Sequence, residues 1–255
     1  MTVRLRFLAA ACVVLLALAL PQAGRADDIS AQRGAIEKIV HDYLLAHPEV
    51  LQDAMNELEK RQQAADAEKH KAAVKEHAQA LFSSPDQVTL GNPKGNVTLV
   101  EFFDYNCPYC KHAMGDMVTL LQTDPNLKVV LKEFPVLGPA SVAAAKVAVA
   151  VRMQDKTGKK YLEFHTKMFG SRGHVDGERA LAVAKEIGLD MNELQKDMKS
   201  AEVDKTLNQD MKLAEALGLN GTPSYVIGDN VIVGAIGLDG LREKVNTARC
   251  GKATC

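Results

Sequence analysis

The sequence has few cysteines, no apolar run of membrane-spanning length and no excess of basic residues, and each absence removes a class of protein. Five cysteines among 255 residues are too few for a scaffold built from disulfides. The N-terminal apolar run, residues 7–20, falls short of the roughly 20 residues of a transmembrane helix. The 31 basic and 32 acidic side chains give a formal charge of −1, which gives no indication of nucleic-acid binding.

The first 26 residues have the three-part pattern of a secretory signal peptide. Arg4 and Arg6 precede the apolar run, and small residues follow it up to Ala26. We therefore predict cleavage near Ala26 and export of the mature chain; a membrane anchor is the alternative. Cleavage would remove three of the 31 basic residues and no acidic one, which leaves 28 basic and 32 acidic side chains, a formal charge of −4.

Residues 27–84 are charged, rich in alanine and poor in glycine, and their pattern predicts helices without a core of their own. Apolar residues recur at helical spacing on both sides of Pro48, which interrupts the pattern because proline is best tolerated in the first turn of a new helix. Beyond Leu58 the pattern thins to alanines among charged residues, as in a long solvated helix or linker. The apolar stripe either folds back onto the main domain or, as we favour, joins copies of the chain. It comprises Ile36, Ile39, Val40, Tyr43, Leu44, Val50, Leu51, Ala54, Met55 and Leu58.

Residues 85–255 are predicted to form one mixed α/β domain, whose start is marked by the Ser-Ser-Pro-Asp turn at 83–86. Apolar, β-branched runs at 97–103 and 127–134 are expected strands, and the helical pattern at 108–121 between them favours a parallel pairing. A helical insertion at about 139–201 should then precede a helix, an antiparallel hairpin and a last helix. The expected helices of the insertion are 141–154, 161–169, 176–187 and 190–198, and the later elements are 202–217, 224–227, 231–233 and 238–249.

Two cysteines stand two residues apart, in Cys107-Pro108-Tyr109-Cys110, directly after an expected strand. Pro108 suits the first position of a helix, which would place the Cys107 sulfur at free backbone N–H groups and at the positive end of the helix dipole. A thiolate is favoured there, whereas Cys110 lies one turn inside the helix and is shielded. Cys107 should therefore attack a disulfide, and Cys110 should resolve the mixed disulfide that results.

Two other interpretations of this pair are weaker. A zinc site needs about four ligands, and the best local addition is His112 on the same helix. A purely structural disulfide across a two-residue gap closes a very short loop and gains little entropy. Redox catalysis is the interpretation that we retain.

The order of elements and the motifs resemble the DsbA family of thioredoxin-fold proteins. The resemblance covers roughly residues 85–249 and is carried by the Cys-Pro-Tyr-Cys motif after VEFFDY and by Gly221-Thr222-Pro223-Ser224 before a strand. The helical N-terminal extension and the segment KEFPVLGP resemble the ScsC and Com1-like branch, whose members include trimeric disulfide isomerases. The resemblance implies an α/β thioredoxin fold with an inserted helical subdomain, preceded by an α-helical stalk.

The resemblance also implies roles for individual residues. The Thr222-Pro223 bond would be cis and would face the cysteine pair, leaving the Thr222 backbone free to pair with an extended client strand. Pro108 and Tyr109 would complete this substrate-binding surface. Glu101, six residues before the first cysteine, matches the family's buried acid and would exchange a proton with Cys110, with a purely structural glutamate as the alternative.

Four further side chains carry no such motif. His165 and His174 lie in the expected insertion without partner motifs and are interpreted as core or surface residues. Cys250 and Cys255 follow the last expected helix, and two thiols so close in sequence usually pair in an oxidising compartment. A second exchange centre and a metal-binding tail are the alternatives for this pair.

The sequence thus predicts a periplasmic thiol–disulfide oxidoreductase, preferably an isomerase or reductase, with no cofactor beyond the redox-active Cys107–Cys110 disulfide and no metal. The expected partners are unfolded or wrongly disulfide-bonded exported proteins, a membrane redox partner of the DsbD or DsbB type, and further copies of the chain, with a trimer favoured. Linked catalytic domains can engage one client at several points. The alternatives are a disulfide-donating oxidase of the DsbA type and a copper-tolerance protein that binds Cu(I) through the two thiolates.

Overall fold

The computed structural model describes residues 24–155 and 157–255, with side chains from residue 32 onward. The described residues divide into two compact units between Gln63 and Ala64. The signal peptide predicted for residues 1–26 lies almost entirely outside the described residues, so its cleavage remains a prediction. Within the described ranges, no helix combines the length and the apolar composition that crossing a bilayer requires.

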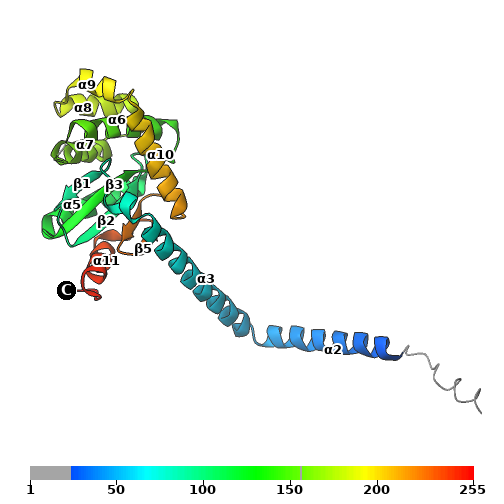
Figure 1. Ribbon diagram of the computed structural model, residues 1–255. Helices are drawn as coiled ribbons and strands as arrows, with labels where there is room; N and C mark the ends of the chain where they lie inside the picture. Colours follow the sequence, from blue (N-terminus) through cyan, green and yellow to red (C-terminus); the bar gives the residue numbers. More distant parts are fainter. Residues whose placement is uncertain (1–23, 156) are drawn as a thin grey trace, which may run out of the picture. The chain divides into compact units, whose positions relative to one another are not determined.

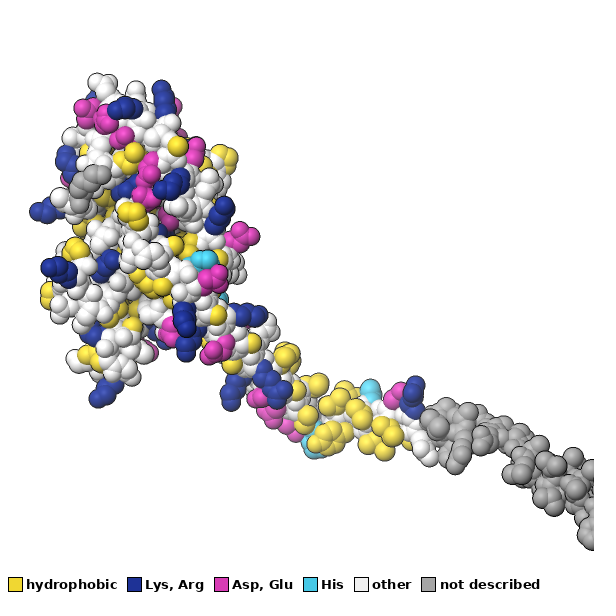
Figure 2. Space-filling model, in the orientation of Figure 1, with side chains coloured by type: hydrophobic (Ala, Val, Ile, Leu, Met, Phe, Trp, Pro, Cys, Tyr) yellow, Lys and Arg dark blue, Asp and Glu magenta, His cyan; other side chains and the backbone are white. Residues whose placement is uncertain are grey.

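The first unit contains one helix and the first half of a second, separated at the proline, as the sequence predicts. Helix α2 (Gly24–Ala46) ends before His47, and α3 (Glu49–Glu76) begins directly after Pro48. Pairs such as Lys38–Asp42 and Glu57–Arg61 lie one turn apart and give these helices modest support. The apolar stripe is exposed in the single chain, and Figure 2 shows its hydrophobic side chains grouped along α2 and the start of α3. Its most exposed members are Ile36, Ile39, Met55 and Leu58, each 60–67% exposed, and Leu45, outside the stripe, is 70% exposed.

The second unit is built on a five-stranded sheet (Figure 1). β2 and β3 run parallel, as the strand-helix-strand pattern predicts, whereas β1 pairs antiparallel with β3 and β4 pairs antiparallel with β2 and β5. The strand order is β1-β3-β2-β4-β5. The strands are β1 (Val88–Gly91), β2 (Val97–Phe103), β3 (Leu127–Glu133), β4 (Ser224–Ile227) and β5 (Asn230–Val233).

Side chains of successive β2 residues point to opposite faces of the sheet and enter two separate cores. Leu99 and Phe103 belong to the core that contains α5 (Pro108–Thr123) and α11 (Gly237–Cys250). Val100 and Phe102 face α10 (Ala201–Ala216) and α4 (Ala78–Phe82). Because both faces are covered, β2 and β3 read as nearly continuous apolar runs in the sequence.

Four helices between β3 and α10 form the predicted insertion, and Figure 1 shows them grouped at one end of this unit, away from α11. The Asp176 and Asp190 side chains cap two of them by accepting hydrogen bonds from backbone N–H groups. The four helices are α6 (Pro139–Gln154), α7 (Lys159–Gly170), α8 (Gly177–Glu186) and α9 (Met191–Asp197).

Two features differ from the sequence-based expectation. The edge strand β1 was not predicted, because its four residues are too short to show a pattern. The segment 64–84, expected to be a solvated linker, belongs to the second unit. Val74 and Leu81 are buried there, in the same core as Phe102 and Phe134. Val74 lies near the end of α3 and Leu81 lies in α4, so both helices bury a side chain in this core, which makes the segment part of the domain.

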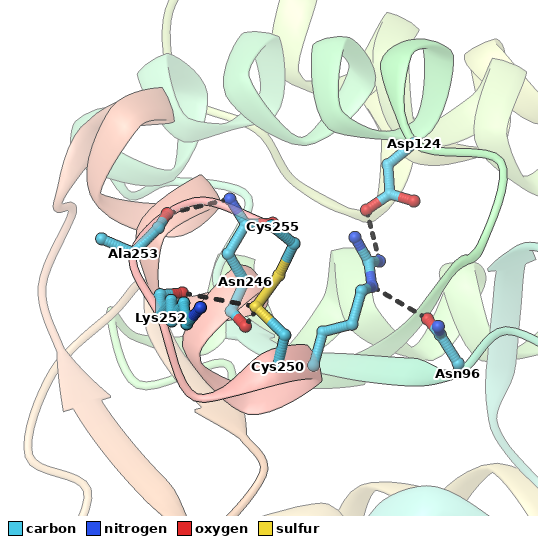
Figure 3. Close-up of a disulfide and its surroundings, with 8 residues drawn as sticks. Asn96, Asp124, Asn246, Cys250, Lys252, Ala253 and Cys255 are labelled. Atoms are coloured by element: carbon cyan, nitrogen blue, oxygen red, sulfur yellow. Dashed lines mark hydrogen bonds and ion pairs between the residues drawn. A yellow bond between two sulfur atoms is a disulfide. The ribbon is translucent and has the colours of Figure 1, made fainter.

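The C-terminal cysteines form a disulfide, as predicted. Cys250 ends α11 and bonds Cys255, and the Asn246 side chain donates to the carbonyl of Ala253 within the loop (Figure 3). Arg249 joins the same end of α11 to the body of the domain through an ion pair with Asp124 at 2.6 Å and a hydrogen bond to Asn96 at 3.0 Å. The disulfide therefore closes a small exposed loop, and Arg249 fixes the helix independently of it.

Candidate active site

Cys107 and Cys110 lie where β2 passes into α5. Cys107 is the N-cap residue of α5, and Pro108 occupies the first turn, as predicted. The Cys107 Sγ accepts a hydrogen bond from the Cys110 backbone N–H at 3.4 Å, so the sulfur faces the free donors of the helix. Cys107 is buried at 5% exposure and Cys110 at 1%, whereas Tyr109 is 66% exposed. The first sulfur thus lies at the edge of the surface and the second lies behind it.

The Thr222–Pro223 peptide bond is cis and lies against the cysteines, as the resemblance implied. Because β4 pairs with β2, the loop that precedes β4 is brought next to the end of β2. The Cys107 thiol donates to the Thr222 carbonyl at 3.1 Å. The Pro223 carbonyl accepts from the Gly234 N–H at 2.8 Å, which holds the loop to the strand that follows β4.

Glu101 points from β2 into the core behind the cysteines. It is buried, and no hydrogen bond to its carboxyl is formed by the described residues. Burial raises the pKa of Glu101 to about 8, and the negative charge of Asp116 adds to the effect. Burial also raises the pKa of Cys110, and a charged Glu101 would raise it further. The Glu101 carboxyl and the Cys110 thiol therefore interact electrostatically within the buried core.

A cluster of polar groups holds the loop before Cys107. The buried Asp104 accepts hydrogen bonds from the Asn106 N–H at 2.8 Å, from the Ser141 hydroxyl at 2.7 Å and from the Leu137 N–H at 2.9 Å. The Asn106 side chain accepts from the Val175 N–H at 2.7 Å and donates to the Val175 carbonyl at 2.8 Å. The cysteine loop is thereby bonded to the helical insertion at two places.

A cavity of about 280 Å³ opens beside Cys107, between the start of α5 and the insertion. Met168, Phe169 and Tyr105 form apolar parts of its wall. Lys111 also lines it, and the Lys111 Nζ donates to the carbonyl of Ser171 at 3.0 Å. The cavity is large enough for a side chain of a bound polypeptide.

A buried polar network lies behind this cavity. The Tyr105 hydroxyl is 3.0 Å from His165 Nδ1 and 3.4 Å from the Tyr161 hydroxyl, which donates to Glu133 at 2.8 Å. Burial lowers the pKa of His165 to about 3, so the imidazole is neutral, and burial raises the pKa of Glu133. His165 is thus a core residue, one of the two placements expected for it, and His174 is exposed.

The residues predicted for the site are brought together: Cys107, Cys110, Glu101, Thr222 and Pro223 meet at one end of the sheet. Sequence reasoning missed the residues that hold the cysteine loop and line the cavity. Asn106 and Val175 lie 69 positions apart, and Lys111 and Ser171 lie 60 apart, so no local pattern connects them. Among the described residues, no group of three or more His, Cys, Asp or Glu side chains could hold a metal ion.

Two protein families match separate parts of the chain, and these parts correspond approximately to the two compact units of the structure. Residues 98–246 match the DsbA-like thioredoxin domain. Residues 32–65 match the N-terminal domain of the copper resistance protein ScsC. The first match covers the cysteines and the cis-proline loop, and the second covers most of the apolar stripe.

Solved structures with the same fold include a thioredoxin-like oxidoreductase from Silicibacter pomeroyi. It is 44% identical and matches 67% of this chain and 96% of its own, with a TM-score of 0.63. A linker-deletion mutant of ScsC from Proteus mirabilis is 26% identical over 90% of this chain and 97% of its own, with a TM-score of 0.66.

Among curated proteins, the chain is 24% identical over 170 residues to the Na⁺/H⁺ antiporter NhaA 1 of Salinispora arenicola. The chain spans about a quarter (26%) of the length of that protein.

Proposed function

This chain belongs to the family of DsbA-like thioredoxin domains, and on that premise we propose that it is a periplasmic enzyme that reduces and isomerises disulfides in exported proteins. The observation that carries the proposal is the pairing of an N-cap Cys107 with the buried Cys110, opposite a cis-proline loop. The Cys107 sulfur is positioned to react with a client, and the Cys110 sulfur lies behind it, where it can resolve the mixed disulfide.

In the first step the Cys107 thiolate attacks one sulfur of a client disulfide. A Cys107–client bond forms, the client S–S bond breaks, and the second client sulfur leaves as a thiolate. The backbone N–H of Cys110 and the dipole of α5 stabilise the negative charge on Cys107 before attack. Tyr109 and Pro108, both exposed beside the sulfur, form the surface that the client first meets.

In the second step Cys110 releases the client. The Cys110 thiol must lose its proton to attack the Cys107 sulfur, and burial makes that loss unfavourable. Glu101 in its charged form is the base that accepts the proton, the Cys110 thiolate then attacks the Cys107 sulfur, and the client sulfur leaves as a thiolate when the Cys107–Cys110 disulfide forms. If a different client thiolate attacks the client sulfur of the mixed disulfide before this step, a new client disulfide forms, the Cys107–client bond breaks and Cys107 leaves as a thiolate, which is isomerisation.

The Thr222 carbonyl is the acceptor for a client strand. In this structure it accepts a hydrogen bond from the Cys107 thiol. A thiolate or a mixed disulfide at Cys107 has no proton to donate, so attack frees the carbonyl for a backbone N–H of the client. Client binding at the loop is thereby coupled to the state of the sulfur.

A protein client is supported by apolar side chains around the site. Val136 is 43% exposed and Leu137 48%, and the Leu137 N–H is bonded to Asp104 beneath the cysteine loop. Exposed apolar groups next to a reactive site favour unfolded chains over small polar thiols.

The exposed stripe of the first unit supports self-association, with three copies as the resemblance to the ScsC branch suggests. Catalytic domains joined in this way would act on one misfolded client at several cysteines. A membrane partner of the DsbD type would keep the cysteines reduced.

Trapping with single-cysteine variants tests the catalytic order. Cys110→Ala should accumulate mixed disulfides with exported proteins, because the resolving thiol is missing, and Cys107→Ala should accumulate none. Non-reducing gels of cells treated with acid to stop exchange would show this difference. Equal trapping by the two variants would refute the assignment.

Isomerase activity is tested with a model protein that carries scrambled disulfides, with recovery of its native activity as the readout. In the same cells, the redox state of Cys107 and Cys110 distinguishes the two directions of the reaction. A reduced pair fits an isomerase or reductase, and an oxidised pair would select the DsbA-type oxidase.

A second candidate function is Cu(I) binding by the two thiolates, which the match to the N-terminal domain of a copper resistance protein favours. Stoichiometric copper binding that requires both Cys107 and Cys110, without activity on scrambled disulfides, would select it.

A further inference from the structure

The cavity beside Cys107 is lined in part by basic side chains, which thiol–disulfide exchange does not itself require. Its wall combines apolar side chains with polar ones such as Asn106, its edge carries Lys111 and His174, and none of the described residues that line it is acidic. The next acidic residue along the chain, Asp176, is already engaged, because its carboxylate accepts from the Arg179 N–H at the start of α8. Lys111 forms no ion pair with the described residues, so the edge of the cavity carries a cation whose charge is unpaired.

The segment that borders the cavity, residues 171–175, is fixed at both ends to the catalytic region. Ser171 is bonded to Lys111 on α5, and Val175 is bonded twice to Asn106. Between these anchors, Arg172, Gly173 and His174 are exposed. The segment thus forms a border that is hydrogen-bonded to α5 and to the loop before Cys107.

We propose that this cavity is a specificity subsite that accepts an acidic side chain next to the reacting cysteine of a client polypeptide. The proposal rests on the exchange function proposed above and names its preferred substrate. An ammonium group has three donors, and only one Lys111 N–H is used by Ser171, so others remain for a carboxylate. Because Cys107 lines the same cavity, the side chain that fills it must neighbour the attacked sulfur.

The cis-proline loop does not share this cavity. Neither Thr222 nor Pro223 is among its lining residues, although the Thr222 carbonyl contacts the same sulfur. Backbone pairing and side-chain selection would thus use separate surfaces around Cys107, which lets one client strand engage both.

The overall charge of the protein separates a local effect of Lys111 from long-range attraction of acidic peptides. The formal charge is −1, so the long-range field does not attract acidic peptides. A preference for an acidic neighbour would therefore come from the local cation and would weaken as added salt screens it.

The test uses symmetric disulfide-linked dimers of one short peptide with Asp, Asn or Lys next to its cysteine. In the reduced Cys110→Ala protein, Cys107 attacks the dimer, one Cys107–peptide disulfide forms, and one peptide thiol is released. Chromatography of that thiol gives a second-order rate constant for each peptide. We expect the Asp peptide to react about two- to fivefold faster relative to Asn than it does with a free thiol, the range expected for an exposed ion pair.

Two pairs of variants locate the effect. Lys111→Gln keeps a donor for the Ser171 carbonyl but has no charge, so the preference for Asp should disappear, whereas Lys111→Arg should retain it. His174→Glu places a negative charge at the cavity edge and should shift the preference toward the Lys peptide. Gln195→Glu makes the same change of charge on exposed α9 and should leave the ratios unaltered.

Three outcomes are distinguishable. No exchange with any peptide would overturn the proposed function itself. Equal exchange with all three peptides, corrected by the free-thiol reference, would overturn the subsite while leaving the function intact. A preference for Asp that survives Lys111→Gln would place the selectivity elsewhere and would also overturn the subsite.

Discussion

Glu101 is uncharged over most of the physiological pH range, because water cannot reach its carboxyl and no neighbour among the described residues donates a hydrogen bond to it. The pKa of about 8 lies far above the ordinary value of 4.5. The folded protein therefore holds a proton that the unfolded chain has lost between these two values. The stability linked to this group is fully present below about pH 4.5 and is lost as the pH rises through about 8.

Glu101→Gln should flatten this dependence, since an amide stays neutral at every pH. Between about pH 5 and 8, the free energy of unfolding of the wild type should fall relative to the variant by about 1.4 kcal/mol per pH unit. Urea titrations at several pH values would measure it, with Glu163→Gln on the exposed face of α7 as the control. Parallel curves for wild type and Glu101→Gln would show that the carboxyl is already charged in the folded state.

The same variant separates a catalytic Glu101 from a structural one. If the carboxylate takes the proton of Cys110, release of a client from the mixed disulfide should slow by about 10²-fold, at the lower end of the range for a general base. The attack by Cys107 should be unchanged. Stopped-flow traces with a peptide disulfide resolve the two steps, and equal rates of release would assign Glu101 to the fold alone.

Thr222→Val removes a hydroxyl whose hydrogen bond acts to lower the pKa of Cys110. The reduced form should become less stable relative to the disulfide, so the redox potential should fall by about 10–30 mV, the equivalent of one hydrogen bond. Equilibration with glutathione buffers measures the potential. Thr98→Val on the same sheet is the matched control and should leave the potential unchanged.

The residues that perform the proposed chemistry could be read from short motifs, because a helix start, a preceding strand and a proline are local features. The cavity could not be predicted, because Asn106 and Lys111 acquire their roles only from contacts with residues 171–175. Those contacts depend on how α7 packs against α5, and helix packing of that kind leaves no sequence signal near the cysteines.

At the scale of elements, the predicted helices and strands between Val97 and Cys250 are all present, since each carries an apolar period and a cap or turn. The sequence predicts that the end of α3 is exposed to solvent, because its one large apolar residue, Val74, is surrounded by alanines and charged residues. Leu81, seven positions later, completes the buried face. The spacing of these two residues was the available signal, and it is too sparse to distinguish a docked helix from an exposed one.

The end of α11 provides a prediction about the second cysteine pair. Cys250→Ser combined with Cys255→Ser should cost at most about 2 kcal/mol of unfolding free energy, because the closed loop is short. Arg249 should keep α11 in place through Asp124 and Asn96. Thermal unfolding would give the stability, and the exchange rate of Cys107 should not change. A large loss of exchange would instead identify Cys250–Cys255 as a second exchange centre.

At the scale of the whole molecule, the structure shows that a stable catalytic domain must begin before Ser84. Removing everything before Ser84 would take away Val74 and Leu81 and expose Phe102 and Phe134. Each buried apolar side chain is worth roughly 1.5–3 kcal/mol, so such a truncation should destabilise the domain. A chain that begins at Ala64, where the second compact unit starts, should keep its stability.

The oligomeric state is the property on which the isomerase proposal depends. Five apolar side chains of the first unit are 60–70% exposed in a single chain, and leaving them in water costs several kcal/mol. Self-association buries them, so the mature protein should be larger than a monomer by light scattering, and the chain from Ala64 should be monomeric. The shorter chain should still reduce peptide disulfides but lose most activity on scrambled proteins, because its sites are no longer linked.

Point variants test the same idea in the full mature chain. Ile39→Glu with Met55→Glu places charges in the exposed stripe and should yield monomers, whereas Gln63→Glu, at an exposed polar position of α3, should not. Peptide exchange should be equal in both variants, since neither lies in the second unit, and only the dissociated protein should lose isomerase activity. If the unaltered mature protein is itself a monomer at micromolar concentration, the stripe must be covered within one chain, and cooperation between linked sites cannot explain isomerisation.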